Sequence, residues 1–174
     1  MPSASRDVIG LLARRFGTSE NTRMALHWKL VIDAANADRQ AAFWAAALDY
    51  VVESPEPLIA ELLAAGHVPE AAVSGSPGAR TFRGLAAVRH PEDPFDAHSG
   101  VGAGRRILFQ EVPESKQGKN RLHLDVHAGD MSLDAHVARL EALGATRVTE
   151  VDQGAAGHWW VLVDPEGNEF CAAG

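Results

Sequence analysis

The residues best suited to chemistry in this sequence lie in one short stretch, RLHLDVH, at residues 121–127. Apolar and ionisable residues alternate there, which is typical of a half-buried strand, so His123, Asp125 and His127 are predicted to share one face. Imidazole nitrogens and carboxylate oxygens can ligate a divalent metal or transfer protons, and they also form the polar faces of ordinary strands. The stretch alone therefore leaves three interpretations open: a metal site, an acid–base site or a polar strand face.

The composition of the chain limits the kind of protein that surrounds this stretch. It has 174 residues, 46% hydrophobic and 22% charged, which predicts one well-cored globular domain or two small packed modules. A net charge of −7 with scattered Lys and Arg argues against nucleic-acid and anionic-membrane partners and favours a neutral or cationic small ligand. The single cysteine, Cys171, excludes an intramolecular disulfide. Because the sequence has no long apolar run and no secretory signal, we expect a cytoplasmic protein.

The elements that must position the chemical residues repeat in the two halves of the chain. Residues 1–24 are predicted to form an N-terminal extension with a short helix. The first half then shows a strand from Leu26, a helix capped by Asn36, a second helix over 54–66, and strands on either side of a loop at 91–104.

The second half has the same order in a shorter form. The stretch RLHLDVH is predicted as a strand, a helix follows and ends at Gly144, and three further strands complete the chain. Each half is thus a βαβββ module, at 26–112 and 121–174. Because one such module leaves a sheet face unburied, we predict an α+β fold in which two βαβββ modules pack as a pair and enclose a cavity, within one domain over 25–174.

Three motifs add a family resemblance to this pattern. The phrase NADRQAAFWAAALDY after the first strand, the segments RGLAAVRHPEDP and RRILFQEVPE, and VDPEGNEFC near the end are similar in order and spacing to the vicinal oxygen chelate superfamily. That superfamily includes glyoxalase I, bleomycin-resistance proteins and extradiol dioxygenases. The chain most resembles the glyoxalase-like domain proteins of the actinobacterial type. The resemblance covers residues 26–174 and implies the paired-module fold and a homodimer.

The resemblance also implies where a divalent metal would be held, by one residue from the first and last strand of each module. Overlaying the two halves and counting from the helix starts and the DPEGN turn places Lys29, Gln110, His123 and Cys171 at these positions. A protonated lysine repels a cation and glutamine is a weak ligand, so we predict no catalytic metal or other cofactor. If a metal is bound, His123, His127 and Cys171 are the expected ligands.

We therefore expect the cavity to hold a small organic ligand. Trp159 and Trp160 are adjacent in a predicted strand, so their indoles lie on opposite faces of the sheet, and we assign Trp160 to the cavity. Trp28 and Trp44 are expected in the core. The predicted ligand-binding residues are Lys29, Gln110, His123, Asp125, His127, Trp160 and Cys171. Each has a structural alternative: the polar side chains can line a wet cavity, Lys29 can pair with an aspartate, and Cys171 can be an inert buried residue.

Two hypotheses about function follow. The first is a metal-independent binding protein, similar to the drug-sequestering members of the superfamily. The second is an enzyme: a lyase, isomerase or dioxygenase with an altered metal site, or a metal-free acid–base catalyst in which Asp125 orients His123 and Lys29 stabilises an enolate. The segment around His90, RHPED, is predicted to be a loop whose charges neutralise one another.

Overall fold

The first module forms a four-stranded sheet with one helix on it. A computed structural model of the chain describes residues 26–174, so the predicted helix in the extension lies outside the described residues. The sheet order is β1-β6-β5-β2, with β1 parallel to β6 and the other neighbours antiparallel. Its elements are β1 (Leu30–Ala34), α2 (Ala37–Leu48), β2 (Val51–Val52), β5 (Leu85–Arg89) and β6 (Arg106–Glu111).

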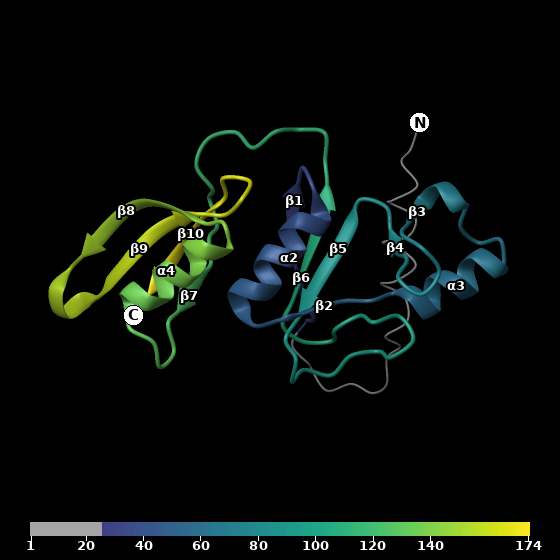
Figure 1. The fold of residues 1–174 in the computed structure, drawn as a ribbon, viewed down its shortest axis with the longest axis horizontal. Coiled ribbons are helices and arrows are strands. Elements are labelled where there is room, and N and C mark those ends of the chain that lie inside the picture. The colour runs from purple at the N-terminus through teal and green to yellow at the C-terminus, as the bar shows by residue number, and fades with distance from the viewer. Residues whose placement is uncertain (1–25) are drawn as a thin grey trace.

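An insertion between β2 and β5 forms a small subdomain at the far end of this module (Figure 1). It consists of α3 (Glu56–Ala64), a short 3-10 helix (Glu70–Ala72), and the hairpin of β3 (Val73–Ser74) and β4 (Thr81–Phe82). The insertion has its own apolar core, formed by Leu58, Ile59, Leu62, Val68, Val73 and Phe82. The helix predicted over 54–66 is therefore confirmed, and it belongs to a separate cluster beside the main sheet.

The second module repeats the topology of the first. Its sheet order is β7-β10-β9-β8, again with the first and last strands parallel. Its elements are β7 (Asp125–His127), α4 (Leu133–Leu143), β8 (Thr146–Asp152), a short 3-10 helix (Gly154–Ala156), β9 (His158–Val163) and β10 (Glu169–Ala173). The predicted pair of βαβββ modules and the helix stop at Gly144, which has a φ of 114°, are thus confirmed.

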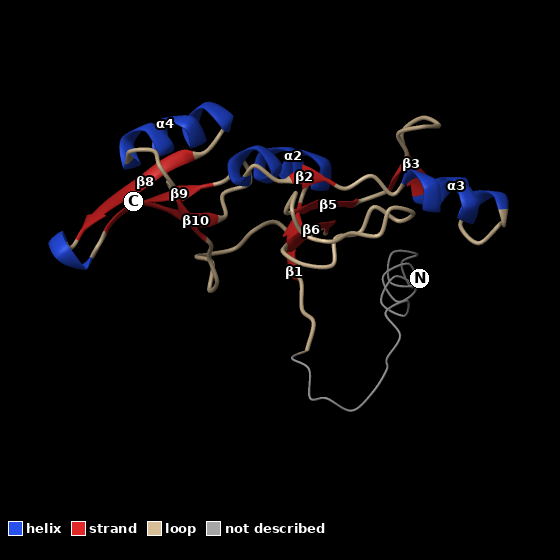
Figure 2. Ribbon diagram, turned by 90° about the horizontal axis from the view of Figure 1, so that it is seen from below, coloured by secondary structure: helices blue, strands red, loops and turns tan. Residues whose placement is uncertain are grey.

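Both long helices cover the same side of the two sheets, as Figure 2 shows for α2 and α4. Alternate residues of the strands, such as Phe109 and Phe170, are buried beneath these helices in one common core. The side chains between them point the other way. We call the side of each sheet that faces away from α2 and α4 its open face.

The second module bonds α2 at both of its ends. The Glu166 carboxylate accepts hydrogen bonds from the backbone N–H groups of Ala35 and Asn36, at 2.7 and 2.9 Å. At the other end, Arg139 of α4 donates to the carbonyl oxygens of Ala46 and Ala47, at 2.8 and 2.7 Å. These are the helix-end groups that lack partners within the helix, so the second module satisfies them.

The centre of α2 is bonded to the second module as well. Trp44 Nε1 donates to the buried Asp164 carboxylate at 3.2 Å, so Trp44 lies in the core as expected. Trp28 does not, because it precedes β1 and its side chain is 84% exposed. In the part of the chain that the structure describes, no helix is long and apolar enough to cross a membrane.

Candidate functional site

Three polar side chains of the second module meet on its open face. Parallel pairing sets Cys171 of β10 beside Asp125 of β7, and His123 precedes β7. One ligand atom of each residue lies within 4.8 Å of the other two, and His123 Nε2 is 3.4 Å from Asp125 Oδ1. His123 and Asp125 are exposed, whereas Cys171 is buried. We call these three residues the open-face triad.

The thiol of the open-face triad is protonated at neutral pH. Burial raises the pKa of Cys171 to about 11, and the hydrogen bond to Asp125 and its charge act in the same direction. A thiolate is the nucleophilic form of cysteine, so this thiol is a poor nucleophile unless a cation displaces its proton.

A cavity at the junction of the modules adjoins the open-face triad. Its volume is about 200 Å³ and it is lined mainly by apolar side chains. The lining residues are Leu30, Val31, Ile32 and Trp44 of the first module and Asn120, Leu122, His123, Leu124, Asn168, Glu169 and Phe170 of the second. His123 is thus both a lining residue and a member of the triad.

The structure does not bring Lys29 and Gln110 to this place. In the register of β1 and β6, Gln110 pairs with Asp33, while Leu30 pairs with Ile107, which sets Lys29 beside Arg106. Lys29 and Gln110 therefore lie four residues apart along the sheet, about 13 Å at the usual strand rise. The predicted set of Lys29, Gln110, His123 and Cys171 is not assembled within the chain.

The physical reason for this difference is a loop length. In the first module Asn36 caps α2 two residues after β1 ends, as its side chain accepts from Arg39 N. In the second module the cap is Ser132, five residues after β7 ends, and Asp130 has no capping role. Counting back from the helix start consequently does not give equivalent positions on the two strands.

The structure also corrects the assignment of Trp160 to the cavity. Trp160 packs against the core on the helix side of β9, with the Arg147 guanidinium 4.9 Å from its ring centroid. Trp159 takes the open face instead, paired with Ala173. His127 shares the open face, but it lies outside the open-face triad, so Asp125 replaces it in the expected His/His/Cys ligand set.

Several cavity residues were missed by sequence reasoning. Leu122 alternates with His123 in the predicted strand, yet it is 81% exposed because β7 begins only at Asp125. Glu169, the first residue of β10, was not among the predicted site residues. Its pKa is lowered to about 2, chiefly because Asn120 N–H donates to it, and Lys116 Nζ lies 3.1 Å from the same carboxylate. The position of Glu169 directly after the DPEGN turn was the sequence signal that could have identified this residue.

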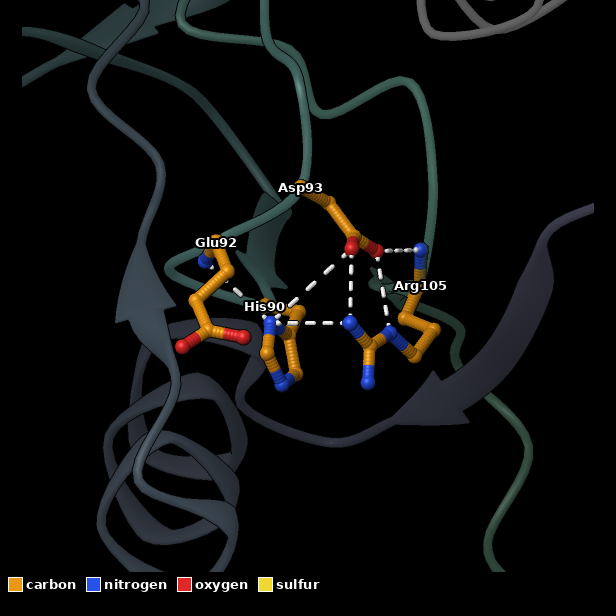
Figure 3. A network of polar contacts seen from close by, with 4 residues as sticks. All are labelled: His90, Glu92, Asp93 and Arg105. Carbon is orange, nitrogen blue, oxygen red and sulfur yellow. Dashed lines mark hydrogen bonds and ion pairs between the residues drawn. The ribbon is translucent and has the colours of Figure 1, made fainter.

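The loop around His90 forms a closed network of polar contacts (Figure 3). Arg105 donates to Asp93 from its backbone N at 2.6 Å and from its guanidinium at 2.7 and 3.1 Å. Arg105 thereby lowers the pKa of Asp93 to about 2. Nδ1 of His90 accepts from the Glu92 N–H at 3.2 Å. These contacts agree with the predicted neutralised loop and fix the ends of the 91–104 segment.

Comparison with known proteins identifies the family of this fold. A family model described as "Glyoxalase-like domain" matches residues 29–173, so the chain belongs to the glyoxalase-like domain family. This family lies within the vicinal oxygen chelate superfamily, as the sequence resemblance implied. A comparison with curated protein sequences gave no match.

Two solved structures with TM-scores above 0.5 support the same fold. The fosfomycin resistance protein FosX from Listeria monocytogenes, in its tetragonal form, has a TM-score of 0.52 and 12% identity over 86% of this chain and 90% of that one. The hypothetical protein SA1046 from S. aureus has a TM-score of 0.51 and 10% identity over 86% and 94%. A glyoxalase/bleomycin resistance protein/dioxygenase family enzyme from Burkholderia phytofirmans PsJN has a TM-score of 0.48 and 17% identity over 83% and 94%. At these identities the likeness concerns the fold alone.

The open-face triad fits a divalent cation of the zinc type. An imidazole nitrogen, a carboxylate oxygen and a thiol sulfur are the three kinds of atom that zinc binds, and three protein ligands leave a coordination position open. His123, Asp125 and Cys171 would hold such an ion. Once bound, it would supply Lewis acidity at the edge of the cavity.

Proposed function

We propose that the chain binds a small organic ligand in the cavity at the module junction, with a polar group of the ligand at His123. The observation that carries this proposal is the lining of the cavity, which is mainly apolar, comes from both modules and includes one member of the open-face triad. Binding sites for small molecules commonly combine an apolar wall with a few convergent polar groups.

The size of the cavity limits the ligand. Its volume of about 200 Å³ lies below the roughly 300 to 1,000 Å³ of drug-sized sites. We therefore propose a ligand of the size of a single aromatic ring, or a longer one that continues onto the open face of the second module. Asp125 and Cys171 would then contact it, while Lys29 and Gln110 would not.

Phenol is a suitable probe, and saturation-transfer NMR on the full chain tests its binding. Val31→Asp places a charge on the apolar wall and should abolish binding, and His123→Ala should weaken it about tenfold by removing one hydrogen bond of the stronger kind. His158→Ala is the matched control, because His158 is an exposed histidine paired with Glu150 outside the cavity. Equal binding by all three variants would contradict the proposal.

The second candidate is an enzyme that uses a divalent cation at the open-face triad, and the triad geometry is what favours it. Purified protein loaded with zinc should retain about one ion per chain after desalting, as determined by elemental analysis. His123→Ala and Cys171→Ser should lose the ion, whereas His158→Ala should keep it, since catalytic zinc requires three protein ligands. Retention of zinc by all variants would exclude the triad as its site.

We also propose that the chain forms a homodimer. Among residues 26–174, large apolar residues beside the first strand of each module stay uncovered: Leu26 is 91% exposed, Trp28 84% and Leu122 81%. Contiguous exposed apolar residues mark interaction surfaces, and Leu122 lines one cavity together with Leu30 and Val31 of the first strand. A second copy seated there would also enlarge the cavity that Leu122 lines.

A further inference from the structure

Three positively charged side chains form a row across the open face of the first module. Arg106 of β6 pairs directly with Arg89 of β5, and the register of β1 sets Lys29 on the other side of Arg106. Their neighbours Ile107 and Val88 are buried under α2, so the three cations point to the open face. Adjacent strands lie about 4.8 Å apart, which makes Lys29, Arg106 and Arg89 close neighbours. We call them the cation row.

Among residues 26–174, Glu53 is the one carboxylate that forms an ion pair with the cation row. Glu53 accepts from Arg106 Nε at Oε1 and from Arg106 Nη2 at Oε2, both at 2.7 Å, and Oε1 also accepts from Gly102 N at 2.8 Å. Arg106 and Glu53 are nearly buried, with side chains 9% and 5% exposed. The hydrogen bonds of Glu53 thus go to Arg106 and to the backbone of Gly102, while its charge also acts on Lys29.

The two outer members of the cation row have no such partner. Within residues 26–174, neither Lys29 nor Arg89 forms an ion pair. The guanidinium of Arg89 lies 3.8 Å from the ring centroid of Phe95, and its Nε is buried with no hydrogen-bond partner among the described residues. A buried donor without a partner is costly, which indicates that another group satisfies it.

Repulsion between the charges of the cation row also indicates that a further group binds there. Like charges directly opposite on neighbouring strands destabilise a sheet, and Arg89 faces Arg106 in this manner. The pKa of Lys29 is lowered, chiefly by partial burial and then by the charge of Arg106. A bound anion would relieve both effects.

The surroundings of the cation row are built for close approach. A Cβ at Gly102 would lie 2.8 Å from Cβ of Arg89 and 3.3 Å from Oε1 of Glu53, so only glycine allows this loop to pack there. Arg106 and Glu53 also line a small cavity of about 70 Å³ between the sheet, α3, β4 and the 99–101 loop, and neither Lys29 nor Arg89 is part of its lining. This space is larger than the roughly 10 to 15 Å³ that one water requires.

We propose that the cation row binds the oxyanion group of a small acidic ligand, a phosphate or a carboxylate. Guanidinium groups match the geometry of both oxyanions through paired N–H donors, and a lysine adds a third charged donor. The chain as a whole carries a net charge of −7, but the positive charge of the cation row is concentrated at one place and can attract an anion there. It shares no residue with the cavity at the module junction, so either proposal can fail while the other stands.

Titration of the full chain with inorganic phosphate, followed by calorimetry at constant ionic strength, tests the cation row. Saturable binding is expected. Arg89→Gln and Lys29→Gln should each weaken it about tenfold, because each removes one charge-assisted donor. Arg39→Gln is the matched control, since Arg39 is an exposed arginine of α2 on the other side of the same sheet, and it should bind phosphate as the unchanged chain does.

Malonate titrated in the same way distinguishes the two classes of ligand. Tighter binding of phosphate assigns the site to phosphorylated ligands, and tighter binding of malonate assigns it to carboxylates. Absence of binding above that of chloride overturns the proposal, and so does equal weakening by Arg39→Gln.

Melting temperatures keep the test independent of any folding defect. In chloride alone, Arg89→Gln removes both the repulsion with Arg106 and the contact with Phe95, so the melting temperature of the variant in chloride is its own reference. Phosphate should then raise the melting temperature of the unchanged chain more than that of the variant. A variant that melts lower in chloride and gains equally from phosphate would show that Arg89 is a packing residue, which overturns the proposal.

Discussion

At the scale of single residues, the open-face triad shows which site residues could be predicted from the sequence and which could not. Alternation placed His123 and Asp125 on one face, and spacing from the DPEGN turn singled out Cys171; the structure brings these three together. Counting back from the helix start failed for Lys29, because the loop between the first strand and the helix differs in length between the modules. Gln110, in contrast, pairs with Asp33 as Cys171 pairs with Asp125. Strand register depends on contacts between distant segments, so a spacing taken from one module does not transfer to the other.

The raised pKa of Cys171 predicts how its thiol reacts. At pH 8.5, alkylation by iodoacetamide should be roughly a hundredfold slower than for a thiol with the ordinary pKa of 9.0, because the folded pKa of about 11 leaves so little thiolate. Asp125→Asn should shift the midpoint of the pH profile downward, since the hydrogen bond to Asp125 and its charge both favour the thiol. Cys171 is the only cysteine, so mass spectrometry of the intact chain reads its alkylation directly.

A control for this prediction is Glu150→Gln, which removes an exposed carboxylate outside the open-face triad. That variant should keep the pH profile of the unchanged chain. Zinc at saturation should protect Cys171 from alkylation if the triad holds the ion. A profile that does not move in Asp125→Asn would show that burial alone raises the pKa.

At the scale of elements, end signals predicted the helices well. Asn36 and Gly144 were identified by residue type, and the structure uses both as helix ends. The strand in RLHLDVH is shorter than predicted, because only Asp125–His127 pairs with β10. A strand needs a partner, and that partner lies more than 40 residues later, out of reach of a local pattern.

The bonds from the second module to α2 predict how the modules are coupled. Arg139→Met and Glu166→Gln should each lower the free energy of unfolding by about 1 to 2 kcal/mol, because each leaves two helix-end groups without their charged partner. The two substitutions act at opposite ends of a helix of about 18 Å, so their effects should add. Urea denaturation followed by circular dichroism measures both.

Arg39→Met provides the reference for this pair, since Arg39 is an exposed arginine of the same helix. It should change stability by less than about 0.5 kcal/mol. If Arg139→Met behaves in the same way, the bonds to Ala46 and Ala47 contribute nothing to the coupling of the modules.

At the scale of the whole molecule, the pairing of modules was predictable from the repeat, whereas the exposure of their first strands was not. Trp28 was expected in the core because it belongs to an apolar run, yet it is 84% exposed in the part of the chain that the structure describes. Periodicity shows that a side chain needs a partner surface, and it does not show whether that surface belongs to the same chain. A homodimer through this region would resolve the discrepancy.

Dimerisation through Trp28 and Leu122 gives the last prediction. Trp28→Lys and Leu122→Lys should each weaken self-association at least about tenfold, because large apolar side chains at the centre of an interface carry most of its affinity. Both side chains are exposed in one chain, so the fold should tolerate either change. Sedimentation equilibrium measures the association, and Val148→Lys is the control, since Val148 is a 58% exposed apolar residue of β8. A monomeric unchanged chain, or dissociation by Val148→Lys alone, would contradict an interface at this end of the modules.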